Sequence, residues 1–289
     1  MLQEFRDELI RSAKSEHTVR AYIDRVNDFL TWLQERYGEE NPSAITTLDT
    51  REYQSYCLNV KKYRPSGIQQ RMSAVKAYCG FLQAKGLLST NPALDVKAIK
   101  SVKRDSAPDV LTKSELHRFR REVHKAGNLR DIAILELLLQ TGVRVSELVN
   151  IDVNDISISE RKGILVVREG KGRKYREIPL STDVRKAFAD YLKVRPLTTD
   201  KKLLQGQRGG LTTDAVSKML KKYARRVGLQ DRIHPHLFRH QLATELLRNK
   251  KQDIALVAEL LGHSSLNTTM IYTRPSADEK AKALEDLFT

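Results

Sequence analysis

The fold of the larger part of the chain is decided by residues 132–142, Ile132-Ala-Ile-Leu-Glu-Leu-Leu-Leu-Gln-Thr-Gly142. Apart from Glu136, the residues from Ile132 to Leu139 are apolar on every side of a helix, which is typical of a helix at the centre of a domain. Gly142 is suited to the left-handed conformation that ends many helices. We therefore expect a buried central helix that ends at Gly142.

Beyond this helix, the spacing of the apolar residues changes from helical to strand-like. Two strands are indicated by Gly163-Ile-Leu-Val-Val-Arg168 and Tyr175-Arg-Glu-Ile-Pro179, with a turn at Gly170-Lys-Gly172 between them. After Asp183 most of the pattern is helical again. The sequence therefore predicts a mainly α fold with a small β-hairpin or sheet.

The first part of the chain predicts a separate helical domain. Apolar residues recur at helical spacing after Ser15 and again after Pro65, and the two runs stop at Gly38 and Gly86. We expect residues 1–96 to form this domain.

A linker is expected at residues 97–110, which are basic and lack sustained apolar periodicity. Thr112-Lys-Ser-Glu115 is a capping-box pattern that opens a second domain over residues 111–289. A second capping-box pattern starts at Ser276, and the apolar residues after it form one stripe of a short helix. Such a stripe, within residues 276–289, either packs on its own domain or docks in a neighbouring protomer.

Composition limits the class of protein. The chain has 289 residues, of which 51 are Lys or Arg and 36 are Asp or Glu, so the net charge is +15. A polyanion is therefore the first partner to consider. No apolar run approaches the length of a membrane span, and the N-terminus carries acids rather than a signal-peptide pattern. Cys57 and Cys79 lie inside helix-like patterns, as expected for buried thiols in a reducing cytoplasm.

Polar residues that could carry chemistry gather in the second half. Arg144 follows Gly142, and Glu147 lies one turn further on, so Arg144 either binds an anion or caps a helix and pairs with Glu147. Lys171, between two glycines at the expected hairpin tip, is either a solvated charge or a residue that reaches a partner. Tyr272 ends a short predicted helix after His263, where it serves either as packing or as a nucleophile.

The segment around Pro235 offers an anion site or a metal site. If a helix starts there, His236 and Arg239 share a face and can point at one anion. His236 and His240 are also spaced as zinc ligands are. Leu237, however, stands where the zinc motif has Glu, and Arg239 would repel a cation. The anion site is the stronger interpretation.

Taken together, these groups place cations and proton carriers around one hydroxyl nucleophile, which fits a phosphodiester substrate. Guanidinium groups match phosphate oxygens, so Arg144 and Arg239 could hold the phosphate without a metal ion. A free phenol has a pKa of about 10, so Tyr272 needs a base, for which His236 is the candidate. Lys171 would protonate the leaving 5′ oxygen. The sequence shows neither a Gly-rich phosphate loop nor an acidic cluster for magnesium, and we expect no metal and no cofactor.

Several short motifs occur in a fixed order along the chain: Thr141-Gly-Val-Arg-Val-Ser-Glu-Leu148, Gly170-Lys-Gly172, His236-Leu-Phe-Arg-His240, and Leu261-Gly-His263 followed by Tyr272. This ordered set resembles the tyrosine recombinase (phage integrase) family. The first half, with Ser15, Thr18 and Tyr22 and later Asn91-Pro-Ala, is similar to the SAM-like core-binding domain of Xer-type members.

The resemblance implies roles for these residues. Arg144 and Arg239 would hold the scissile phosphate, with His263 binding it as well. Tyr272 would form the 3′-phosphotyrosyl link. Lys171 would protonate the leaving group, and His236 would accept or donate a proton near the nucleophile. The residues implied to support them are Glu147 and His240.

The resemblance also implies an assembly. Two domains would close as a C-shaped clamp around double-stranded DNA with inverted-repeat core sites, with a dimer on each site and a tetramer in the synapse. The tail would dock in a neighbouring protomer, and strands would be exchanged through a Holliday junction without ATP. We expect a cytoplasmic, nucleoid-associated, Xer-like enzyme that resolves circular DNA dimers or transposon cointegrates. The alternatives are a phage or mobile-element integrase, a topoisomerase of type IB, and a DNA-binding regulator that does not cut.

Overall fold

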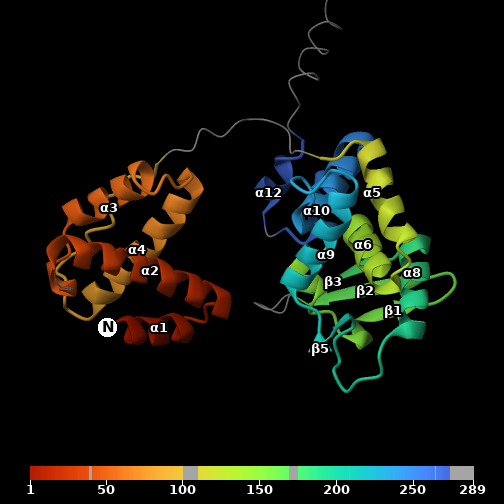
Figure 1. The fold of residues 1–289 in the computed structure, drawn as a ribbon, viewed down its shortest axis with the longest axis horizontal. Helices are drawn as coiled ribbons and strands as arrows, with labels where there is room; N and C mark the ends of the chain where they lie inside the picture. The colour runs from red at the N-terminus through yellow and green to blue at the C-terminus, as the bar shows by residue number, and fades with distance from the viewer. Residues whose placement is uncertain (39–40, 100–109, 169–174, 208, 264, 274–289) are drawn as a thin grey trace, which may run out of the picture. The chain divides into compact units, whose positions relative to one another are not determined.

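The computed structural model describes residues 1–38, 41–99, 110–168, 175–207, 209–263 and 265–273 (Figure 1). These residues belong to two compact units, residues 1–104 and residues 105–289. Within the described ranges, no helix is both long enough and apolar enough to cross a membrane.

The first unit is helical. Its α-helices are α1 (Leu2–Arg11), α2 (Glu16–Tyr37), α3 (Thr47–Asn59) and α4 (Pro65–Ala84). The side chain of Ser15 caps α2 by accepting a hydrogen bond from the backbone N–H of Thr18, and Gly38 ends the helix. The core of the unit contains packed aromatic rings, such as Phe5 against Tyr78, with centroids 5.3 Å apart. The described part of this unit is therefore built from helices packed around an aromatic core.

The second unit combines helices with two small sheets. Its helices are α5 (Lys113–Lys125), α6 (Leu129–Thr141), α7 (Val145–Leu148), α8 (Thr182–Val194), α9 (Thr213–Arg226), α10 (Pro235–Thr244), α11 (Ile254–Leu261) and α12 (Leu266–Met270). Its strands are β1 (Ile156–Ile158), β2 (Gly163–Arg168), β3 (Tyr175–Pro179), β4 (Gln205–Gly206) and β5 (Gly209–Gly210). The mainly α fold with a small sheet is confirmed.

The larger sheet extends the predicted hairpin by one strand. The strand order is β1-β2-β3, all antiparallel, and Leu165 of β2 lies opposite Ile178 of β3. The sequence does not predict β1, because three residues are too few to establish an alternating pattern. The expected turn at 170–172 lies outside the described residues.

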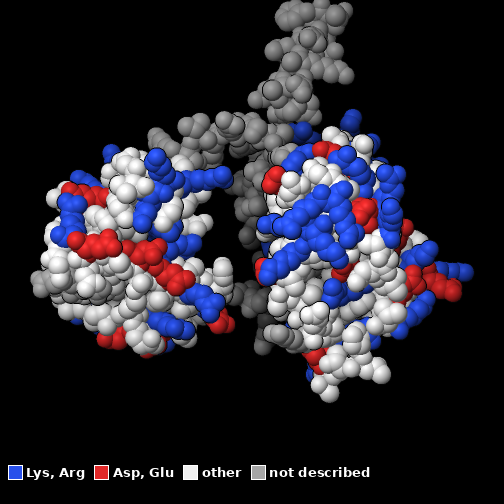
Figure 2. Space-filling view, viewed as in Figure 1, with Lys and Arg blue, Asp and Glu red and all other residues white. Residues whose placement is uncertain are grey.

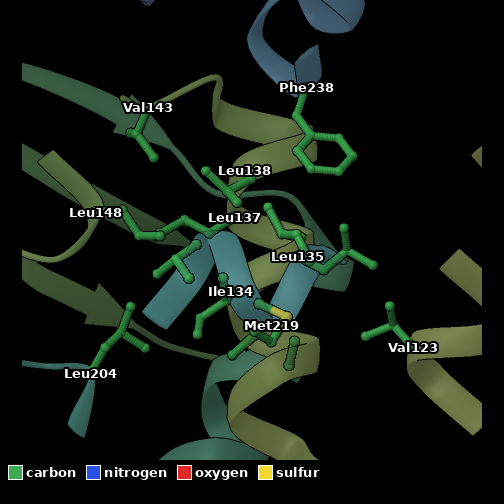
Figure 3. Close-up of a cluster of buried hydrophobic side chains, with 14 of the residues drawn as sticks. Val123, Ile134, Leu135, Leu137, Leu138, Val143, Leu148, Leu204, Met219 and Phe238 are labelled. Carbon is green, nitrogen blue, oxygen red and sulfur yellow. The ribbon is translucent and has the colours of Figure 1, made fainter. Parts of the chain in front are cut away.

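The predicted central helix is α6, which packs against α8 and α10. Its apolar side chains belong to one buried cluster with Val123, Met219 and Phe238 from the helices around it (Figure 3). Glu136, the polar interruption, is buried and accepts hydrogen bonds from Arg120 and Gln140, each at 2.7 Å. Each fully buried Leu or Ile contributes about 1.5–3 kcal/mol, so this helix anchors the unit that carries the candidate site.

Candidate active site

Gly142 turns the chain from α6 directly into the site. It has φ +62°, and a Cβ at this position would lie 2.6 Å from Leu261 Cδ2, so the close packing requires glycine. Two residues later, Arg144 caps α7 and its Nη1 donates to Glu147 Oε1 at 2.6 Å. Arg144 Nη2 donates to the carbonyl oxygen of Gly262 at 2.9 Å. Its side chain remains 33% exposed, so the guanidinium is both held in place and accessible.

Glu147 is shared by two arginines. Arg176 on β3 donates from Nη2 to Glu147 Oε2 at 2.8 Å and from Nε to the carbonyl oxygen of Leu260 at 3.1 Å. Burial by itself would raise the pKa of Glu147, but hydrogen bonds from Arg176 and from the backbone N–H of Arg144, together with the arginine charges, lower it below its ordinary value. The carboxylate therefore stays ionised and fixes both guanidinium groups.

Arg176 is a residue that the sequence analysis missed. It lies on the same face of β3 as the buried Ile178, an inward position where a charged side chain is unusual. The alternation of side chains along the predicted strand 175–179 was the signal in the sequence that could have identified Arg176. The guanidinium also explains Gly262, which has φ +66° and where a Cβ would lie 2.6 Å from Arg176 Nη1.

Arg239 on α10 is 5% exposed. Its Nη1 donates to the carbonyl oxygen of Gly142 at 2.8 Å, while its buried Nη2 has no hydrogen-bond partner among the described residues. Burial, reinforced by the charge of Arg144, lowers the pKa of Arg239 to about 10. A buried guanidinium with an unused donor beside a second guanidinium is a site that an anion would stabilise.

His263 lies just after α11, and its Nδ1 is 2.7 Å from Thr269 Oγ1. Burial and the nearby charges of Arg239 and Arg144 lower the pKa of His263 to about 4, so its imidazole is neutral at pH 7. Its ring stacks on that of Tyr272, with centroids 6.4 Å apart.

Tyr272 follows α12 and is 2% exposed. Its ring packs in an apolar cluster with Ala243, Val257 and Leu261, and its Oη lies 2.6 Å from Nδ1 of His240. Burial raises the pKa of the phenol, and the charge of Arg239 partly offsets that rise. The phenol is therefore protonated at pH 7 and needs a base before it can attack.

The structure brings together most, but not all, of the predicted site residues. Arg144, Glu147, Arg239, His240, His263 and Tyr272 are joined by the contacts and charge interactions given above. His236 begins the same helix as Arg239, is exposed and makes no hydrogen bond to Tyr272 in the part of the chain that the structure describes. Lys171 lies outside the described residues. No group of three or more potential metal ligands occurs within the part of the chain that the structure describes.

The pair of arginines on Glu147 leads to a prediction about stability. Glu147→Gln is expected to lower the free energy of unfolding by about 3 kcal/mol at pH 7, because Arg176, only 10% exposed, loses its counter-charge. The wild-type carboxylate, whose folded pKa is lowered, stabilises the fold above its ordinary pKa of 4.5, and this contribution is lost as the pH falls through the folded pKa. The variant should lack this acid-dependent loss.

Urea unfolding at a series of pH values measures this effect. The exposed Glu259 on α11 provides the control, since Glu259→Gln should leave the free energy of unfolding within about 0.5 kcal/mol of wild type. Equal stability of the two variants at pH 7 would contradict the role assigned to Glu147.

Comparison with known proteins agrees with this geometry. The phage integrase family matches residues 109–279, and the N-terminal SAM-like domain of phage integrases matches residues 2–86. Tyrosine recombinase XerC of Neisseria gonorrhoeae is 32% identical, over 97% of this chain and 92% of that protein. A tyrosine recombinase of Pseudothermotoga lettingae is 33% identical, over 99% of this chain and 98% of that protein.

Solved structures show the same fold. The XerA recombinase has a TM-score of 0.55 at 28% identity, over 99% of this chain and 97% of that one. The XerH site-specific recombinase in a post-cleavage complex with a palindromic difH substrate has a TM-score of 0.75 at 18% identity, over 94% of this chain and 80% of that one. The resemblance drawn from the ordered motifs is confirmed: the chain belongs to the phage integrase family, the tyrosine recombinases.

Proposed function

We propose that this enzyme cuts and rejoins double-stranded DNA at specific sites, with Tyr272 forming a 3′-phosphotyrosyl intermediate. The observation that carries the proposal is the buried Nη2 of Arg239, which lacks a partner among the described residues and lies in the charge environment of Arg144, His263 and Tyr272. A scissile phosphate would satisfy this donor and offset the repulsion between the two arginines.

Each of these residues has a separate role in the proposed reaction. Arg144 and Arg239 bind the non-bridging oxygens of the phosphate, and neutral His263 donates a further hydrogen bond to it. Tyr272 Oη attacks phosphorus, the bond to the 5′ oxygen breaks, and Lys171 protonates that oxygen. The phosphotyrosyl ester conserves the energy of the broken bond, so rejoining requires no ATP. His236, exposed at the start of α10, would contact the DNA backbone near the reacting phosphate.

A basic surface on the second unit supports DNA binding. Lys and Arg side chains gather over the region of α9 and α10 in the view of Figure 2. On α9, Lys218 and Arg226 are paired with Asp214 and Glu122. Lys221 and Arg225 are exposed and form no ion pair with any residue in the described ranges. Contacts from such cations to phosphates would supply affinity that falls with increasing salt.

The proposed assembly is a dimer on each inverted-repeat core site and a tetramer in the synapse, exchanging strands through a Holliday junction. Structural relatives support the first step, since a lambda integrase dimer bound to a COC′ core site has a TM-score of 0.71 at 18% identity. The division into residues 1–96, 97–110 and 111–289, with the 276–289 tail docking in a neighbouring protomer, is part of this proposal. The enzyme would act at the nucleoid, resolving circular DNA dimers or transposon cointegrates.

A nicked suicide duplex tests the proposal. The duplex is selected from a randomised library by binding to the protein. A nick just beyond the scissile phosphate then lets the short fragment that carries the free 5′ hydroxyl diffuse away after cleavage. A covalent adduct at the 3′ phosphate is expected, followed by strand joining between two intact sites. Tight binding without any adduct would instead indicate a regulator. An adduct with relaxation of supercoiled DNA but no exchange between sites would indicate a topoisomerase.

A further inference from the structure

His240, rather than His236, lies against the nucleophile. Its Nδ1 is 2.6 Å from the phenolic oxygen of Tyr272, and the two ring centroids are 5.4 Å apart. His236, one helical turn earlier, is exposed. We propose, on the basis of the function given above, that His240 is the general base that takes the proton of Tyr272 during DNA cleavage.

The burial of Tyr272 makes a protein base necessary. The side chain is 2% exposed and its ring lies in an apolar cluster, so the phenol has little contact with bulk water that could accept its proton. Among the described residues, His240 is the one hydrogen-bond partner of Oη. His263 stacks on the same ring, but its Nδ1 contacts Thr269 instead.

The surroundings of His240 keep its imidazole neutral. Burial is the main cause that lowers its pKa, and electrostatic interactions with His236, His234 and Arg239 add to the effect. The other groups that interact with it are Tyr272 itself and His263, which is neutral at pH 7. In the tautomer that carries its proton on Nε2, Nδ1 has a free lone pair and accepts the phenolic hydrogen.

The step balances without any further reactant. As Oη forms its bond to phosphorus, the phenolic proton moves to Nδ1 of His240 and gives an imidazolium ion. The bond from phosphorus to the 5′ oxygen breaks, and that oxygen takes a proton from Lys171. In the rejoining step the 5′ hydroxyl attacks, its proton returns to Lys171, and the imidazolium of His240 returns a proton to Tyr272. Base and acid are thus separate groups, which allows each to be tested alone.

A sulfur leaving group separates the two proton transfers. In a suicide duplex with a 5′-bridging phosphorothiolate, the leaving thiolate needs no proton, so the rate of adduct formation reports activation of the nucleophile alone. His240→Asn is the informative variant, because its amide oxygen can still accept a hydrogen bond near the position of Nδ1 but cannot act as a base at neutral pH. Lys171→Ala and His236→Asn are compared on both duplexes.

His240→Asn is expected to slow adduct formation by about 10²–10⁴-fold on both the oxygen and the sulfur duplex. Lys171→Ala should be slow on the oxygen duplex and recover on the sulfur one. In the wild type the rate should fall at low pH as His240 becomes protonated, and His240→Asn should lack that ionisation. Thermal unfolding checks that the variant is folded, and His240→Gln repeats the test with a longer amide.

Two results would overturn the assignment. One is adduct formation at the wild-type rate by both His240→Asn and His240→Gln on the sulfur duplex, which would show that His240 only packs against Tyr272 or hydrogen-bonds to it. The other is a defect on the sulfur duplex that belongs to His236→Asn instead. A wild-type enzyme that forms no adduct with either duplex would refute the proposed function itself, which is a separate outcome.

Discussion

Tyr272→Phe is expected to abolish covalent attachment to DNA while leaving DNA binding unchanged. The variant loses the one atom that would form the bond to phosphorus, so only uncatalysed cleavage remains and the rate should fall by about 10⁶-fold or more. The ring still fills the apolar cluster formed with Ala243, Val257 and Leu261. The substitution should lower the free energy of unfolding by only about 1 kcal/mol, through loss of the hydrogen bond to His240.

The measurement uses the nicked duplex with a labelled strand, run on a denaturing gel, with binding followed by fluorescence anisotropy. Tyr223 is the matched control, because it is also fully buried and its hydroxyl donates to Asp131 at 2.8 Å, away from the site. Tyr223→Phe should still form the adduct. Adduct formation by Tyr272→Phe at the wild-type rate would show that another residue is the nucleophile.

Arg239→Met is expected to reduce cleavage by about 10³–10⁵-fold without weakening the fold. The guanidinium is 5% exposed, its pKa is lowered to about 10 by burial and by Arg144, and its Nη2 is unused. An apolar side chain of similar length removes this unfavourable charge, at the cost of the hydrogen bond to Gly142. The free energy of unfolding should therefore stay constant or rise by about 1–2 kcal/mol.

Urea unfolding and single-turnover cleavage of the same preparation test both parts of this prediction. Arg195 offers the opposite case, since its guanidinium donates to the carbonyl oxygens of Leu203, Asp200 and Lys202. Arg195→Met should lose stability and keep its cleavage rate under native conditions. If Arg239→Met instead loses several kcal/mol of stability, Arg239 is a structural arginine and its place in the reaction is refuted.

The sequence by itself determined the elements whose causes are local. The apolar run before Gly142, the strand-like residues 163–168 and the capping box at Thr112 each depend on neighbouring residues, and each appears in the structure as predicted. The ordered motifs likewise identified the family, because each motif is contiguous. Strand β1 was missed, since three residues carry no readable period.

Only the tertiary structure decided which of the polar groups meet. Arg176 joins Glu147 from a strand 29 residues later in the chain, and His240 rather than His236 reaches Tyr272. The physical reason is that a helix or strand presents each side chain in a direction set by its backbone, while the partner in that direction comes from a remote segment. The two histidines lie one turn apart on α10, and only the tertiary contact that brings Tyr272 to that helix determines which one faces the phenol.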